Sequence, residues 1–211
     1  MQMAPPHEEE YGPFLEAILA GDHRQAFAVL RAAMERGMSY VYEAIVQPAM
    51  QRVGELWHIH EISVADEHLA TGVAQAAITS LYPLFPWPVG GPRAMVTCVQ
   101  GERHELGART VSDLLALAGW DTVFLGADVP LEAMLERVRK DRPVFVGLSA
   151  TLPTHMPAVR KTIDLLRSQA PAVKILVGGR AMIAGTEEAL GADAVAHSGS
   201  DAVHVARAWK P

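Results

Sequence analysis

Five short apolar runs, separated by longer stretches with helical character, occupy the second half of the chain. The runs are AMVTCV (94–99), DTVFLG (121–126), VFVGLSA (144–150), KILVGG (174–179) and ADAVAHSG (192–199). Most are rich in β-branched residues and apolar throughout, as is typical of parallel strands covered on both faces. Helices are predicted between and after them, over residues 104–118, 130–141, 155–170, 181–190 and 200–209. This alternation predicts βαβ units and a Rossmann-like (flavodoxin-like), doubly wound parallel sheet of five strands.

The first half of the chain has apolar residues at helical spacing and no strand pattern. Four helical segments are predicted, over residues 11–22, 23–37, 39–61 and 63–85. Ser39 and Ser63 stand where helix N-caps are expected, and Asp66, three residues after Ser63, suggests a capping box. Pro48 is expected to kink or begin a helix. Four helices with short connections predict a small antiparallel four-helix bundle.

A proline-rich segment divides the two halves. PLFPWPVGGP, residues 83–92, holds four prolines and two glycines, a composition that cannot continue a helix. We therefore expect a helical bundle over residues 1–84, a linker over 85–92 and a sheet domain over 93–211.

Composition and charge argue against several classes of protein. The net charge is -6 and no basic run occurs, so the electrostatic footprint of a nucleic-acid binder is missing. No apolar run approaches the roughly 20 residues of a membrane span, and the first ten residues do not have the pattern of a signal peptide. The single cysteine, Cys98, lies in an apolar run and is predicted to be an inert core thiol. These features predict a cytoplasmic protein that binds neither nucleic acid nor a membrane.

The loop after the first predicted strand carries the most specific chemistry. Parallel sheets bind ligands at the carboxyl ends of their strands, and there the sequence reads QGERHELGA. His104 could bind a metal, Glu102 could hold its other ring nitrogen, and Gly107 would allow a bulky group to approach. Motifs for nucleotide phosphates are absent from the sequence. The alternative is a charged loop with an incidental histidine.

Two further strand ends could line the same site. GLSATLP follows the third strand, and its Ser149 and Thr151 could bond a ligand or merely cap the next helix. VGGRAM follows the fourth strand, and its Gly178 and Gly179 could leave a surface free of side chains or form a tight turn. The local pattern leaves both alternatives open.

Together, the three loops resemble those of the cobalamin-binding domain family, over residues 93–211. In that family the dimethylbenzimidazole tail of the cofactor enters the sheet domain, and a histidine replaces it below cobalt. The resemblance implies that His104 is the lower axial ligand, with Glu102 where most members have Asp. The cofactor-binding residues that it implies in this half are Glu102, Arg103, His104, Glu105, Leu106, Gly107, Asp128, Ser149, Thr151, Gly178 and Gly179.

The helical half also carries a pattern that resembles a corrinoid-covering cap. Trp57, nine further residues and then Glu67 and His68 form W-x9-EH, which is similar to the cap signature of CarH-type light sensors. GERHELGA, around His104, also resembles their lower loop, including the Glu in place of Asp. The resemblance implies that Trp57, Glu67 and His68 lie over the adenosyl group of adenosylcobalamin. It also implies that His58 can bind cobalt from above after photolysis. The alternative interpretation is that Trp57 packs in the core of the bundle and that His58 and His68 are ordinary exposed residues.

These features lead to a ranked set of functional hypotheses. The first is a non-enzymatic light sensor whose illumination changes a homo-oligomer or the binding of a separate regulatory protein. It would lack direct DNA binding, because no segment resembles a basic recognition helix. The alternative is a corrinoid carrier subunit of a methyltransferase system, with methylcobalamin or hydroxocobalamin. A mutase subunit is the weakest hypothesis. Three further histidines, His155, His197 and His204, are predicted to be structural or surface residues.

Overall fold

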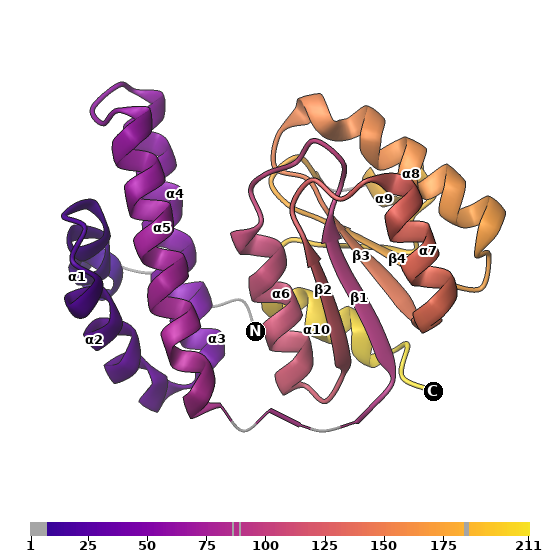
Figure 1. The fold of residues 1–211 in the computed structure, drawn as a ribbon, viewed down its shortest axis with the longest axis horizontal. Coiled ribbons are helices and arrows are strands. Elements are labelled where there is room, and N and C mark those ends of the chain that lie inside the picture. Colours follow the sequence, from indigo (N-terminus) through magenta and orange to yellow (C-terminus); the bar gives the residue numbers. More distant parts are fainter. Residues whose placement is uncertain (1–7, 86, 89, 184–185) are drawn as a thin grey trace. The chain divides into compact units, whose positions relative to one another are not determined.

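The computed structural model describes residues 8–85, 87–88, 90–183 and 186–211. The chain forms two compact units, Met1–Pro86 and Trp87–Pro211 (Figure 1). Residues 86 and 89 of the predicted linker, and 184–185 of the predicted helix 181–190, lie outside the described residues. The finer division into 1–84, 85–92 and 93–211 stays a prediction.

The second unit is built on a five-stranded parallel sheet of order β2-β1-β3-β4-β5. The strands are β1 (Arg93–Cys98), β2 (Asp121–Gly126), β3 (Phe145–Ser149), β4 (Lys174–Gly178) and β5 (Ala194–Ala196). The helices are α6 (Leu106–Leu117), α7 (Leu131–Asp141), α8 (Met156–Gln169), α9 (Thr186–Leu190) and α10 (Gly199–Arg207), with a 3₁₀ turn η4 (Pro153–His155) before α8. The predicted flavodoxin-like, doubly wound fold is confirmed.

Two apolar cores hold the helices on opposite faces of the sheet. Alternate strand residues point to opposite faces. Met95 of β1 therefore packs with residues of α7 and α8, whereas Val96 packs with residues of α6 and α10. On the second face the buried Trp120 ring meets Phe145 edge to face, with centroids 4.9 Å apart. This packing holds the strand ends, and thus their loops, in fixed positions.

Two strands depart from the predicted pattern for reasons of position. All residues of β2 are partly exposed, because β2 is an edge strand with a neighbour on one side only. The last strand is confined to Ala194–Ala196. Before it, the Asp193 carboxylate accepts hydrogen bonds from Arg167, Lys174 and the backbone N–H of Ile175. After it, Ser198 already caps α10.

The first unit consists of packed helices. They are α1 (Glu8–Leu19), α2 (His23–Ala33), α3 (Met38–Tyr40), the π-helical segment η2 (Val41–Val46), α4 (Gln47–His58) and α5 (Val64–Leu81), with 3₁₀ turns η1 (Met34–Arg36) and η3 (Tyr82–Leu84). Its core includes Phe14, Ile18, Leu30, Tyr42 and Ile78, all at most 1% exposed. None of the described helices is long and apolar enough to cross a membrane.

Two of the predicted helix starts can be compared with the structure. Ser63 caps α5 through the predicted capping box with Asp66. The N-cap prediction for Ser39 is wrong, because Gly37, with φ 91°, precedes the helix and places Ser39 inside it. Pro48 lies in the first turn of α4, directly after the π-helical segment. Val46 and Gln47 before it are already helical, so Pro48 lies inside a continuous helical stretch, at the point where the π-helical segment changes to α-helix.

Candidate functional site

The site lies where the chain leaves β1 and β3 in opposite directions across the sheet. β1 is followed in the chain by β2 on one side, and β3 is followed by β4 on the other. In doubly wound sheets, ligands bind at the carboxyl edge beside such a point. Glu102 comes from the β1 loop, and its side chain is 0% exposed.

The Glu102 carboxylate joins the two loops through four contacts. Oε1 accepts a hydrogen bond from the backbone N–H of His104 at 2.8 Å and meets His104 Nδ1 at 2.5 Å. Oε2 accepts from the backbone N–H of Thr151 at 2.6 Å and meets His155 Nδ1 at 2.9 Å. One buried carboxylate therefore contacts two imidazole rings that are 51 residues apart in the chain (155 − 104).

The charge of Glu102 determines which ring nitrogen of His104 could bind a metal. Burial alone would raise the pKa of Glu102, but hydrogen bonds from both histidines and two backbone N–H groups hold that pKa well below its usual range. An ionised carboxylate only accepts hydrogen bonds, so His104 Nδ1 carries the hydrogen and Nε2 is the nitrogen for a metal. The His104 side chain is 56% exposed, in front of its buried partner. This arrangement suits a metal-bound histidine with a carboxylate behind it.

Glu105 and Asp128, both predicted to contact the cofactor, are used to hold the loops. Asp128 Oδ1 accepts from Gly101 N–H at 2.7 Å, and Asp128 N–H donates to Glu102 O at 2.9 Å. Glu105 Oε2 accepts from Ala127 N–H at 3.1 Å. These bonds fix the β1 loop against the β2 loop. Direct contact of either residue with a cofactor stays a prediction.

A row of small residues crosses the sheet beside this loop. Cys98 pairs with Ser149, Ser149 with Gly178, and Gly178 with Ala196, one residue from each of four neighbouring strands. By strand alternation the row faces α6 and α10. No member is larger than cysteine, so this end of the sheet has little side-chain bulk facing α6 and α10. That composition fits the narrow, tail-receiving space that the family resemblance implies.

The backbone packing after β4 explains why positions 178 and 179 are both glycine. A Cβ on Gly179, whose φ is 98°, would lie 2.2 Å from the Ala150 carbonyl oxygen. A Cβ on Gly178 would lie 3.1 Å from the Ala196 carbonyl oxygen. The turn therefore requires glycine at position 179 whether or not a ligand is bound, and the tight-turn interpretation is sufficient there.

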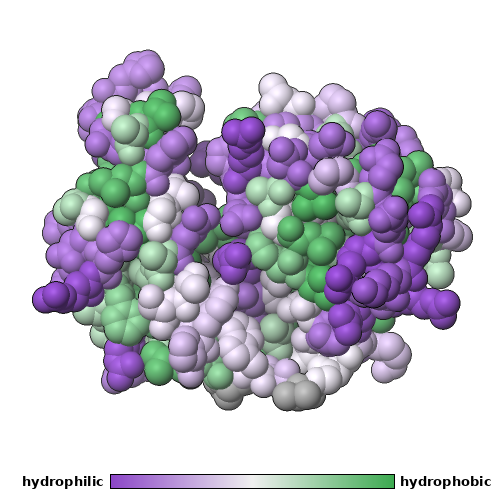
Figure 2. All heavy atoms as spheres, in the orientation of Figure 1, coloured by the Kyte–Doolittle hydropathy of each residue, from purple (hydrophilic) through white to green (hydrophobic). Residues whose placement is uncertain are grey.

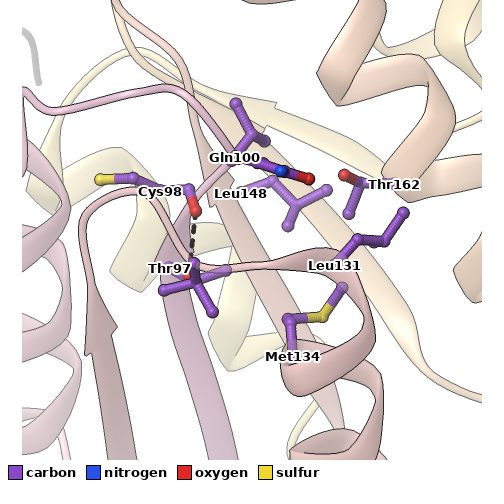
Figure 3. Close-up of a pocket in the computed structure, with 9 residues that line it drawn as sticks. Thr97, Cys98, Gln100, Leu131, Met134, Leu148 and Thr162 are labelled. Atoms are coloured by element: carbon purple, nitrogen blue, oxygen red, sulfur yellow. Dashed lines mark hydrogen bonds between the residues drawn. The ribbon is translucent and has the colours of Figure 1, made fainter.

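A small pocket lies on the other face of β1. It is lined by Thr97, Cys98, Val99, Gln100, Val129, Leu131, Met134, Leu148 and Thr162. The hydroxyls of Thr97 and Thr162 already donate to backbone carbonyls, and the sulfur of Cys98 points away from Leu131 and Thr162 (Figure 3). The pocket is mostly apolar and lies on the side of α7 and α8, away from the small-residue row.

The four predicted cap residues cluster near the turn between α4 and α5. Trp57 is 46% exposed, which excludes it from the bundle core of its unit, and His58 next to it is exposed. His68 Nδ1 contacts Glu67 Oε2, while Glu67 Oε1 accepts from Thr71 Oγ1. Figure 2 shows hydrophobic patches among hydrophilic ones in this region. The turn therefore presents an aromatic ring, imidazoles and a carboxylate at the surface of the unit.

Comparison with known proteins identifies the family. Residues 92–206 match the family model described as a B12 binding domain, and residues 13–82 match a second model of the same description. The chain belongs to the family of cobalamin-binding proteins, and cobalamin with its cobalt is the cofactor class that this family binds.

Relatives and solved structures match nearly the whole chain. Dimethylamine corrinoid protein 2 of Methanosarcina acetivorans is 33% identical over 206 residues, which cover 95% of each chain. The solved monomethylamine corrinoid protein of Methanosarcina barkeri has the same fold, with a TM-score of 0.82, 24% identity and coverage of 94% and 97%. A chain of the methanol:cobalamin methyltransferase complex from the same species has a TM-score of 0.54, 23% identity and coverage of 96% and 80%.

These matches overturn the light-sensor prediction. The repressor CarH of Myxococcus xanthus is 32% identical over 142 residues, which cover 66% of this chain and 47% of CarH. Relatives that match 95% of this chain include two corrinoid proteins named for dimethylamine. The photoreceptor and regulatory assignments are therefore wrong, and they rested on two short patterns, W-x9-EH in the helical half and the loop around His104.

One residue of the site was missed by sequence reasoning. His155 was predicted to be structural or at the surface, yet its ring contacts Glu102. The sequence did indicate that His155 could lie near His104, because His155 follows β3 in a loop at the same carboxyl edge of the sheet. Every polar residue of the strand-end loops was therefore a candidate, including those beyond the recognised motif.

Proposed function

We propose that this protein is a corrinoid carrier subunit of a methyltransferase system. The observation that carries the proposal is the contact of His104 Nδ1 with the fully buried Glu102, because His104 would then hold cobalt through Nε2. The whole-length similarity to proteins named for dimethylamine and monomethylamine supports a methylated amine as the class of methyl donor.

The residues of the sheet unit would bind and orient the corrinoid. Glu102 fixes the tautomer of His104, and the bonds of Asp128 and Glu105 keep the loop in place. The row of small residues, Cys98, Ser149, Gly178 and Ala196, would accept the nucleotide tail of the cofactor when His104 takes the place of that tail at cobalt. A bound corrinoid supplies a cobalt centre that can accept a methyl group from one substrate and give it to another.

The helical unit would cover the upper face of the corrin ring. Trp57, His58, Glu67 and His68 are the residues that we propose for this contact, because they share one turn and Trp57 is exposed there. Methyl-bearing and hydroxo forms of cobalamin suit a carrier, whose upper ligand must be small and exchangeable. The partner would be a separate methyltransferase protein, as in the solved methanol:cobalamin methyltransferase complex.

Lower ligation can be tested by electron paramagnetic resonance of the reduced Co(II) form after loading with cobalamin. Nitrogen on the lower face splits the cobalt signal, and uniform ¹⁵N labelling of the protein changes that splitting only if the nitrogen comes from the protein. We expect a labelled-histidine splitting in wild type and its loss in His104→Ala, with His204→Ala on the exposed side of α10 as the control. An unlabelled nitrogen in wild type would mean that benzimidazole stays on cobalt.

The carrier role has a separate test. The loaded protein, reduced chemically to Co(I), is mixed with a corrinoid-dependent amine methyltransferase and methyl-labelled dimethylamine, and the label that elutes with the carrier is counted. We expect label on wild type and little on His104→Ala. No label with monomethylamine, dimethylamine, trimethylamine or methanol systems would refute the carrier proposal.

A further inference from the structure

The charged residues at the carboxyl edge of the sheet are unevenly spread. Glu102, Glu105 and Asp128 lie in the loops after β1 and β2, and each accepts a hydrogen bond from a backbone N–H. Arg180 lies in the loop after β4 and is exposed. In the strand order β2-β1-β3-β4-β5, β4 is two strands from β1 and three from β2. Neighbouring strands are about 4.8 Å apart, so roughly 10–14 Å separates these carboxylates from the β4 loop. An anionic group at this edge is therefore repelled least beside β4.

The turn after β4 holds the backbone of Arg180 in place. Ala181 N–H donates to the Ala150 carbonyl at 3.2 Å, and Met182 N–H donates to the Gly179 carbonyl at 3.0 Å. Ala181 and Met182 pack with the core on the α7 and α8 face of the sheet. Arg180 does not join that core, and its side chain has no hydrogen bond or ion pair with a residue that the structure describes. Its guanidinium is therefore available to a ligand at the edge.

Arg180 also stands next to the space proposed for the nucleotide tail. Gly178, two residues before it, belongs to the row of small residues and pairs with Ser149 and Ala196 on the two neighbouring strands. The tail of cobalamin carries a phosphodiester between the corrin ring and the base. With the base at the row and the corrin ring outside the edge, the phosphodiester has to cross the edge between them. Gly178 and Gly179 present no side chain there, and Arg180 is the next residue along the chain.

The chemistry of the two groups matches. The phosphodiester is the anionic group of the tail, whereas the side chains of the corrin ring are neutral amides. A guanidinium is always charged, and its parallel N–H donors fit two oxygens of one phosphate. An exposed arginine at a fixed point of the edge can therefore recognise the phosphodiester without contacting the corrin ring or the base.

Other charged residues of the edge are less suited to an anion. Arg103, in the loop after β1, is also exposed, but it stands between Glu102 and Glu105 in the chain, so nearby negative charge offsets its own. On the far side of β4, Asp201 follows β5, and its carboxylate already accepts a hydrogen bond from the N–H of His197. The β4 loop therefore offers the cation with the least local compensation among the described loops.

We propose that Arg180 binds the phosphodiester of the nucleotide tail and thereby selects complete cobamides over corrinoids that lack the nucleotide loop. The inference rests on the proposed entry of the tail at the row of small residues. Its test measures binding alone and involves no methyl transfer. A failure of the carrier role and a failure of this inference therefore give different results.

The test measures the affinity of the cofactor-free protein for three corrinoid probes by spectral titration. Hydroxocobalamin has the whole tail, cobinamide phosphate keeps a phosphate but lacks the ribose and the base, and cobinamide lacks all three groups. We expect Arg180→Gln to weaken binding of the first two probes roughly 5- to 10-fold, the effect of one exposed charge-assisted contact. Its affinity for cobinamide should equal that of wild type. Arg180→Lys should fall between the two proteins, because an ammonium keeps the charge but not the fork.

Two comparisons separate a local contact from a general effect of charge. Lys161→Gln removes the same charge from an exposed position on α8 and should bind all three probes as wild type does. Salt screens exposed ion pairs. Added salt should therefore weaken the binding of hydroxocobalamin to wild type more than its binding to Arg180→Gln.

Several outcomes would overturn the inference. Equal losses for all three probes in Arg180→Gln would show that Arg180 supports the fold or the corrin ring instead of the phosphate. A loss confined to hydroxocobalamin would place its contact at the ribose or the base. A loss selective for the phosphate-bearing probes in Arg103→Gln, but not in Arg180→Gln, would place the phosphate at the β1 loop. Unchanged affinities for every probe in Arg180→Gln would leave Arg180 without a role in binding.

Discussion

Replacing Glu102 with glutamine would test how much the buried carboxylate stabilises the sheet unit. The substitution preserves size, but one terminal atom becomes an NH₂ group, which donates hydrogen bonds instead of accepting them. In one orientation the NH₂ faces the two donors of His104, and in the other it faces Thr151 N–H and His155 Nδ1–H. A ring can change tautomer to accept, but a backbone N–H cannot. Every orientation therefore leaves at least one backbone donor unsatisfied.

The magnitude follows from these lost contacts. Hydrogen bonds to a charged group contribute about 1.5–3 kcal/mol each, so two lost bonds correspond to about 3–6 kcal/mol. Tautomer change and the smaller desolvation cost of a neutral amide offset part of this loss. We expect the free energy of unfolding of the sheet unit to fall by about 2–4 kcal/mol at neutral pH. The assay is native-state hydrogen exchange of β1 and β3 amides, which reports that unit separately.

The effect should depend on pH in a defined direction. The pKa of Glu102 is lower in the folded protein than its usual value. Its contribution to stability is thus fully present above its unfolded pKa of about 4.3 and is lost as the pH falls toward its folded pKa. The stability gap between wild type and Glu102→Gln should be constant near neutral pH and should narrow in acid. The control, Glu105→Gln, keeps an amide oxygen for its one bond to Ala127 and should change stability little. Glu102→Gln as stable as wild type at neutral pH, or a gap that widens in acid, would refute this reasoning.

Further predictions concern residues inside the helical unit and the sheet unit. Ser63→Ala removes one half of the capping box of α5 and should destabilise the helical unit by about 1 kcal/mol in urea unfolding. Gly179→Ala should abolish a stable sheet unit in circular dichroism, because its Cβ would clash with the Ala150 carbonyl. Cys98, whose thiol pKa is raised to about 12 by burial and then by two nearby carboxylates, should resist iodoacetamide until the protein unfolds. Asp193→Ala removes hydrogen-bond partners from two basic side chains and one backbone N–H, and it should lower the thermal midpoint by several degrees.

The fold was predictable because its signals are local and periodic. Apolar runs of strand length between amphipathic helices define βαβ units, and the handedness of such units leaves few strand orders to consider. The pairing of Glu102 with His104 was predictable for the same reason, since they lie only two positions apart in the chain. What could not be predicted was the extent of β5, because the carboxylate of Asp193 and the cap at Ser198 compete with strand formation on either side.

His155 shows the limit of local patterns in a different way. It is 53 residues from Glu102, and only the adjacency of β1 and β3 in the sheet brings the two together. A sequence motif records the residues of one loop, whereas a site at the sheet edge combines several loops. Once a strand order is predicted, the polar residues at the ends of neighbouring strands can be paired as hypotheses. Pairing the β1 and β3 loops in this way makes His155 a candidate partner of Glu102.

The light-sensor error has a physical cause as well. Trp57, Glu67 and His68 define an aromatic and polar surface at the turn between α4 and α5, and such a surface can lie over a small upper ligand or a large one. Indole stacking is attractive to any flat or apolar neighbour and does not encode its size. In a corrinoid protein, selectivity for an upper ligand depends on the space above cobalt. Residue types at a nine-residue spacing do not specify that space, whereas similarity over 206 residues compares residues throughout both units.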